Sequence, residues 1–159
     1  MFSIIQRCTT LAVIIMLFLL ASCAGAPATA SLNDLPMYPG AVELKPGEST
    51  LADTLANNNQ ADTAIRGNLG TGGKTEQRGF HLPADSSWNA IKAFYDEKLK
   101  ADGWATNSMV SGIMEQANQG NDIFQSANWQ RGKQNVTVIM LTAPIDKSQK
   151  ELIISLSSQ

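Results

Sequence analysis

The sequence predicts an α+β fold: a mostly antiparallel sheet of about four to six strands, with one amphipathic helix packed on one face. Residues 86–102 carry apolar side chains at helical spacing, and residues 134–142 alternate as a strand does. Short turns join the other strand candidates, and short connections favour antiparallel neighbours. One amphipathic helix can cover one face of such a sheet.

A turn and a short strand open the predicted domain. Pro39-Gly40 suits the two central positions of a type II turn, because Pro presets its own φ and Gly accepts a positive φ. Residues 41–44 then form a short predicted strand. Pro36 and Pro39 lack an amide hydrogen, so we expect this strand at a sheet edge.

Residues 45–75 fit no regular pattern. They hold an Asn-rich run at 57–60, followed by several glycines. Residues 49–61 can form one or two helical turns, but we expect the segment as a whole to be disordered or to be a mobile binding loop. The glycines do not indicate a phosphate-binding loop, because no Gly-Lys-Ser/Thr follows them.

Residues 76–82 form the second predicted strand. Phe80 and Leu82 share one face of it. His81, the only histidine, then points to the other side, where we expect it to meet water.

Residues 86–102 form the clearest element, an amphipathic helix. Trp88, Ile91, Tyr95 and Leu99 recur at helical spacing, whereas most charged residues lie off this stripe. Such a stripe can line a ligand site, but we expect it to pack in the core.

The ends of this helix carry capping signals. Asp85 or Ser86 can cap the amino end by accepting a main-chain hydrogen bond. Gly103 suits the left-handed position that ends a helix, and Trp104 would then pack on Leu99, as in a Schellman ending.

Four strand candidates follow the helix, so the expected order is strand, strand, helix and four strands. Residues 111–122 are expected to be a loop and 131–134 a tight turn. Residues 134–142 are apolar on both faces, which is typical of a central strand. The four candidates are residues 104–110, 124–130, 134–142 and 150–157.

The amino terminus carries a targeting signal. Residues 11–20 are an unbroken apolar run, which has the length of a secretory signal core and is too short to span a bilayer. Leu20-Ala21-Ser22-Cys23 resembles the bacterial lipobox. In that motif small residues admit the peptidase, and the Cys thiol takes the lipid. Ala24-Gly25-Ala26 or Ala28-Thr29-Ala30 could instead serve an ordinary signal peptidase.

Lipidation at Cys23 also explains the cysteine count. Cys8 leaves with the signal, and Cys23 is then the one cysteine of the exported chain. We therefore expect a removed signal peptide at 1–22, a flexible tether at 23–34, and a single α+β domain at 35–159. The acyl chains, palmitate among them, would anchor the protein to a membrane.

Charge excludes one class of partner. After removal of Arg7, eleven basic residues face fourteen acidic ones, and they form no basic stripe. We therefore expect no nucleic-acid binding. Because Ala24 rather than Asp follows Cys23, the expected location is the periplasmic face of the outer membrane in a Gram-negative cell. Otherwise it is the outer face of the cell membrane.

Two phrases carry a family resemblance. Tyr38-Pro39-Gly40-Ala41 and Phe94-Tyr95-x3-Leu99-x3-Gly103-Trp104 resemble the YPGA and FYxxxLxxxGW motifs of a group of uncharacterised bacterial lipoprotein domains. The resemblance spans about residues 35–157. It implies a fold, since these positions are a turn, a helix face and a cap. It implies no activity.

No catalytic, cofactor or metal site is expected from the residues. Asp96 and Glu97 lie on a predicted solvent face, Asp85 is a candidate cap, and His81 lacks a supporting motif. Acid–base work needs paired carboxylates or a tuned histidine, and metal sites need clustered ligands.

Three functions remain open, and an enzyme is the least favoured. The favoured one is a non-catalytic binding or adaptor module of the cell envelope, which would take a partner at a sheet edge or on the 45–75 segment. The alternative is a structural or stress lipoprotein, and a small-ligand-binding domain with a pocket between helix and sheet is a special case of the binding module. The sequence does not indicate an oligomeric state.

Overall fold

A computed structural model describes residues 29–68 and 73–158. Within these ranges the chain forms one short 3-10 helix, five strands and three α-helices. Cys23 and the lipobox residues Leu20, Ala21 and Ser22 lie outside the described residues. The elements in chain order are η1 (Leu32–Asp34), β1 (Val42–Glu43), α2 (Thr50–Asn68), β2 (Lys74–His81), α3 (Trp88–Ala101), α4 (Ser108–Asn118), β3 (Phe124–Arg131), β4 (Gln134–Thr142) and β5 (Lys150–Ser158).

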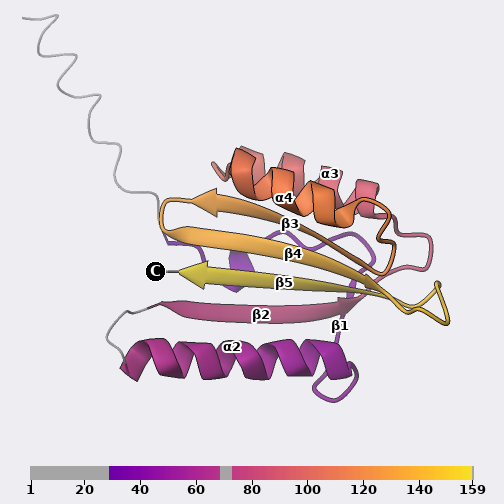
Figure 1. The fold of residues 1–159 in the computed structure, drawn as a ribbon, viewed down its shortest axis with the longest axis horizontal. Helices are drawn as coiled ribbons and strands as arrows, with labels where there is room; N and C mark the ends of the chain where they lie inside the picture. The colour runs from indigo at the N-terminus through magenta and orange to yellow at the C-terminus, as the bar shows by residue number, and fades with distance from the viewer. Residues whose placement is uncertain (1–28, 69–72, 159) are drawn as a thin grey trace, which may run out of the picture.

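The strands form one antiparallel sheet in the order β1-β2-β5-β4-β3 (Figure 1). The predicted α+β class is therefore confirmed. The strand expected at 150–157 is β5, at the centre of the sheet. The strand expected at 134–142 is β4, which lies between β5 and β3. The two-residue strand β1 is an edge, as its prolines predicted.

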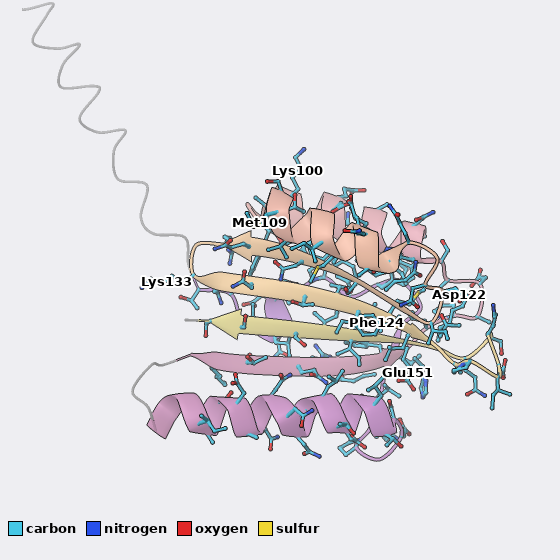
Figure 2. The ribbon with its side chains drawn as sticks, in the orientation of Figure 1. Lys100, Met109, Asp122, Phe124, Lys133 and Glu151 are labelled. Atoms are coloured by element: carbon cyan, nitrogen blue, oxygen red, sulfur yellow. The ribbon has the colours of Figure 1, made fainter. Side chains whose placement is uncertain are left out.

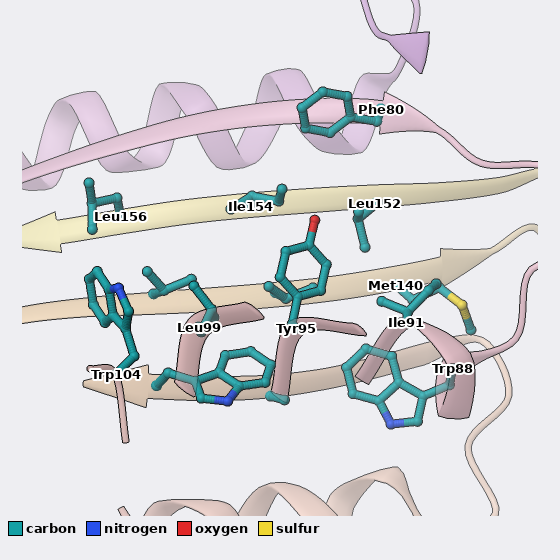
Figure 3. Close-up of a cluster of buried hydrophobic side chains, with 14 of the residues drawn as sticks. Phe80, Trp88, Ile91, Tyr95, Leu99, Trp104, Met140, Leu152, Ile154 and Leu156 are labelled. Atoms are coloured by element: carbon teal, nitrogen blue, oxygen red, sulfur yellow. The ribbon is translucent and has the colours of Figure 1, made fainter. Parts of the chain in front are cut away.

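The main core lies between α3 and one face of the sheet (Figure 3). The apolar stripe predicted for this helix is buried there, and Trp104 joins it. The register aligns the inward side chains of neighbouring strands, so Val138 lies between Ala127 and Ile154. Phe80 and Leu82 are buried and His81 is exposed, as expected.

Both ends of α3 use local capping. Its amino cap is Ser87, which accepts a hydrogen bond from the Ala90 amide, so the expected cap at Asp85 or Ser86 is wrong by one or two positions. Its carboxyl end confirms the Schellman prediction. Gly103 has a φ of 81°, and the amide of Trp104 donates to Leu99 O at 3.0 Å.

Residues 50–68 form helix α2, so the expectation of a disordered or mobile loop at 45–75 is wrong over this range. Helix α2 lies against β2 (Figure 1). It contacts Gln77 and Gly79, whose side of the strand is opposite to that of Phe80 in the α3 core. Gly79 makes this contact possible, because a β-carbon there would come within 3.0 Å of Leu44 and 3.4 Å of Ala52. The side chain of Gln77 adds a hydrogen bond to Ala52 O, and Asn59 donates to Gln77.

The segment after Gly103 is a second correction. Residues 104–110 were expected to be a strand, but only Ala105 pairs, in an isolated bridge with Gln130. Asn107 then caps α4 by accepting hydrogen bonds from the amides of Met109 and Val110. The expected loop at 111–122 is therefore mostly helix.

The last part of the expected tether at 23–34 packs on the domain. Leu32 is buried in the core. The main chain of Ala30 exchanges two hydrogen bonds with the Gln134 side chain, at 2.9 and 2.8 Å. These contacts fix the chain beside the turn between β3 and β4.

Candidate binding groove

A groove of about 470 Å³ opens between α3, α4 and the outer edge of β3. We call it the α3–α4 groove. The helices supply charged and polar side chains, and the sheet supplies tryptophan and main-chain groups. Its lining residues are Lys92, Asp96, Lys100, Trp104, Ala105, Thr106, Ser111, Met114, Glu115, Ser126, Ala127, Asn128 and Trp129.

A fixed polar network forms one wall of the groove. The indole of Trp129 donates to Asp96 Oδ1 at 3.0 Å, and Lys92 donates to Asp96 Oδ2 at 2.8 Å. Asp96 was expected on a solvent face, but it is only partly exposed and holds the Trp129 ring in place. Lys100 and Glu115 are exposed and bring charge of both signs to the same groove.

Within the described residues, one main-chain position at the edge of β3 has no hydrogen-bond partner. The amide and carbonyl of Gln130 pair with Ala105, at 2.7 and 2.9 Å. Those of Ser126 pair with the Asn118 side chain, at 2.9 and 2.8 Å. Main-chain groups alternate in direction along a strand, so those of Asn128 point to the same edge. The main-chain groups of Asn128 lie between the contacts at Ser126 and Gln130, where α4 does not cover the strand edge. They therefore face the groove, which Asn128 lines.

The side chain of Asn128 does not fill this position. Its amide nitrogen donates to Val136 O at 3.1 Å and to Thr137 Oγ1 at 3.0 Å, both on the neighbouring strand β4. The side chain thus leans inward over the sheet and leaves the outer edge of the strand free.

Among the described residues, the pKa values that depart clearly from their usual range belong to groups that do not line the groove. Hydrogen bonding from Arg78 lowers the pKa of Glu43, and hydrogen bonding from Lys147 lowers that of Asp122. Burial raises the pKa of the Tyr95 phenol well above its ordinary value. These shifts are those of structural ion pairs and of a buried ring, and none creates an acid–base pair.

Other residues considered from the sequence are dispersed. His81 and Asp85 are exposed and outside the groove, and Glu97 is exposed beside Lys98 on α3. Across residues 29–68 and 73–158, no three His, Cys, Asp or Glu side chains gather in a group that could hold a metal ion. In the same ranges, no helix combines the length and the apolar character that a membrane span requires.

Sequence reasoning missed the groove because it depends on α4. Asn118 and Asn128 carry no motif, and residue 118 lies in the segment 111–122 that was expected to be a loop. The one usable signal was Asn107, a good helix cap followed by Val110 and Met114 at helical spacing.

Comparisons with protein-family models, with curated proteins and with solved structures gave no match.

Proposed function

We propose that this protein is a lipid-anchored, non-catalytic binding module of a bacterial cell envelope, and that it holds its ligand in the α3–α4 groove. The lipobox-like residues ending at Cys23 support the anchor. The open main-chain position of Asn128, inside a groove lined with both charged and aromatic side chains, carries the binding claim. The volume of the α3–α4 groove, about 470 Å³, lies within the range of small-molecule sites, roughly 300–1,000 Å³.

The contact between Ala30 and Gln134 limits how the domain would be oriented relative to its lipid anchor. Ala30 is fixed to Gln134, and a chain extends at most about 3.6 Å per residue, so seven residues from Cys23 reach roughly 25 Å. The β3–β4 turn, which carries Lys133, would therefore face the membrane. Asp122 and Glu151 lie at the opposite end of the sheet (Figure 2).

The location follows from the anchor. It is the periplasmic face of the outer membrane if the organism is Gram-negative, and otherwise the outer face of the cell membrane. A groove open at the side of the domain would then be reached from the aqueous space next to the lipid surface.

A partner-binding loop at 45–75 is the weaker hypothesis. Helix α2 contributes to the fold through Ser49, which caps it by accepting from the Ala52 amide and donates to Glu151 on β5. Deleting 49–75 would remove these contacts together with any partner site. The groove is therefore the better place to test binding.

The test is a thermal-shift screen with small molecules extracted from the envelope. Ser111 lines the groove, so Ser111→Trp should fill it. Ala61→Trp, on the exposed side of α2, is the matched control. We expect at least one fraction to raise the melting temperature of the wild type and of Ala61→Trp but not of Ser111→Trp. Equal shifts in all three proteins would place binding elsewhere.

A further inference from the structure

We propose that the α3–α4 groove binds a ligand through a primary carboxamide or through one residue of an extended peptide, which pairs with the main-chain amide and carbonyl of Asn128. The inference rests on the proposed function and names its ligand class. A group that satisfies this position must present one acceptor and one donor side by side. A primary carboxamide does so, and so do the amide and carbonyl of one extended peptide residue, whereas carboxylates offer acceptors only.

The same strand edge already shows this chemistry at two places. At Ser126, the Asn118 carboxamide accepts from the main-chain amide at 2.9 Å and donates to the carbonyl at 2.8 Å. At Gln130, the main-chain amide and carbonyl of Ala105 do the same. Asn128 lies midway between them and faces the same direction, so a third amide fits the series.

The two neighbours also limit the size of the ligand. Positions 126 and 130 are about 13–14 Å apart along a strand, and both are occupied by the chain itself. One residue can pair between them, but a long strand cannot lie along this edge. The occupant is therefore a short peptide or another compact amide, rather than a protein that adds a strand to the sheet.

The walls of the groove fit a short peptide that has free termini. Lys92 and Lys100 can attract a carboxylate, while Asp96 and Glu115 can attract an ammonium group. Lys92 and Asp96 already neutralise each other at 2.8 Å, so Lys100 and Glu115 are the better placed to recognise the termini. Met114 and Trp104 add apolar contact.

The experiment is an NMR titration with two matched probes, triglycine and trisarcosine. They share backbone length, carbonyls and terminal charges, but the peptide nitrogens of trisarcosine carry methyl groups instead of hydrogens. We expect triglycine to move the Asn128 amide proton downfield in a saturable way and to slow its hydrogen exchange. We expect trisarcosine to bind at least tenfold more weakly.

Variants at Asn128 give the second arm. Asn128→Pro removes the outward amide without removing a ladder hydrogen bond, whereas Asn128→Ala keeps that amide. Both lose the side-chain bonds to β4, so their comparison isolates the amide. We expect Asn128→Ala to bind triglycine and Asn128→Pro to lose at least tenfold in affinity.

Two results would overturn the inference. The first is equal affinity for the two probes, and the second is a titration in which the Asn128 amide proton does not move. If envelope fractions still stabilise the wild type and not Ser111→Trp, the groove remains a binding site for another ligand class. If the fractions shift the melting temperatures of the wild type and Ser111→Trp equally, or shift neither, the proposed function fails as well.

Discussion

The side chain of Asn118 completes the hydrogen bonding of Ser126 at the outer edge of β3. Its nitrogen donates to the Ser126 carbonyl at 2.8 Å, and its oxygen accepts from the Ser126 amide at 2.9 Å. Helix α4 thus lies beside the outer edge of β3, and its Asn118 side chain takes the place of a neighbouring strand's main chain at Ser126. The Asn118 side chain thereby protects the strand edge at Ser126, whereas the edge at Asn128 stays open.

Removal of this side chain should destabilise the domain. Asn118→Ala leaves the amide and the carbonyl of Ser126 without their partner, at a cost of about 1–3 kcal/mol. Asn118→Asp keeps an acceptor but loses the donor, so it should lie between alanine and the wild type. Urea unfolding followed by tryptophan fluorescence measures the three free energies. Equal stability of all three would show that α4 does not depend on this contact.

The hydroxyl of Tyr95 should be dispensable. It is buried, lies near the main chain of Tyr38, and has no hydrogen-bond partner of normal geometry among the described residues, while its ring packs edge-on against Phe94. Figure 3 shows the phenol directed from α3 toward β5. Because an unsatisfied buried polar group costs free energy, Tyr95→Phe should raise the free energy of unfolding by about 1 kcal/mol. Tyr38→Phe is the matched control in urea unfolding, and a loss of stability in Tyr95→Phe would contradict the prediction.

The pair between Glu43 and Arg78 should give a small, pH-dependent stabilisation. Arg78 donates to both carboxylate oxygens, at 2.7 and 2.8 Å, and this lowers the pKa of Glu43. A lowered folded-state pKa stabilises the fold above the unfolded value, about 4.3, and the gain is lost as pH falls through the folded value.

Since Glu43 is half exposed, the effect should stay below about 1 kcal/mol. Urea unfolding of the wild type and Glu43→Gln at several pH values tests it. The difference in free energy should be largest near neutral pH and should disappear in acid. A difference that grows as pH falls would have the wrong sign.

The anchored orientation can be tested with single labels. Lys133 lies on the β3–β4 turn, and Ser148 lies on the β4–β5 loop at the other end of the sheet. With Cys23 acylated, Lys133→Cys and Ser148→Cys each supply one reactive thiol. In vesicles with brominated lipids, a fluorophore at 133 should be quenched more than one at 148. Equal quenching would show that the docking of Ala30 on Gln134 does not orient the domain.

Local rules predicted the elements whose signals lie within a few residues. Gly40 has a φ of 77° and Ala41 donates to Tyr38 O at 3.1 Å, as the type II turn requires. Helix α3 was predicted equally well, because its apolar stripe and the glycine at 103 both indicate a helix that ends before residue 103. Strong local signals of this kind give the same answer whatever the rest of the chain does.

The elements that failed depend on distant contacts. Helix α2 has no apolar stripe, and its Asn-rich run is a weak helix former, but Gly79 and Gln77 hold it on β2. Residues 104–110 hold apolar and β-branched side chains that suit either a strand or a helix. The groove could not be predicted, because its position follows from where α4 leaves β3.

Native mass spectrometry of the protein purified from its own membranes can detect both the lipid anchor and a bound ligand. We expect a chain that begins at acylated Cys23 and carries a small molecule, which is retained by Ala61→Trp and missing from Ser111→Trp. An acylated chain that carries no small molecule, in the wild type as in Ser111→Trp, would contradict the binding role. An unmodified Cys23 would contradict the anchor.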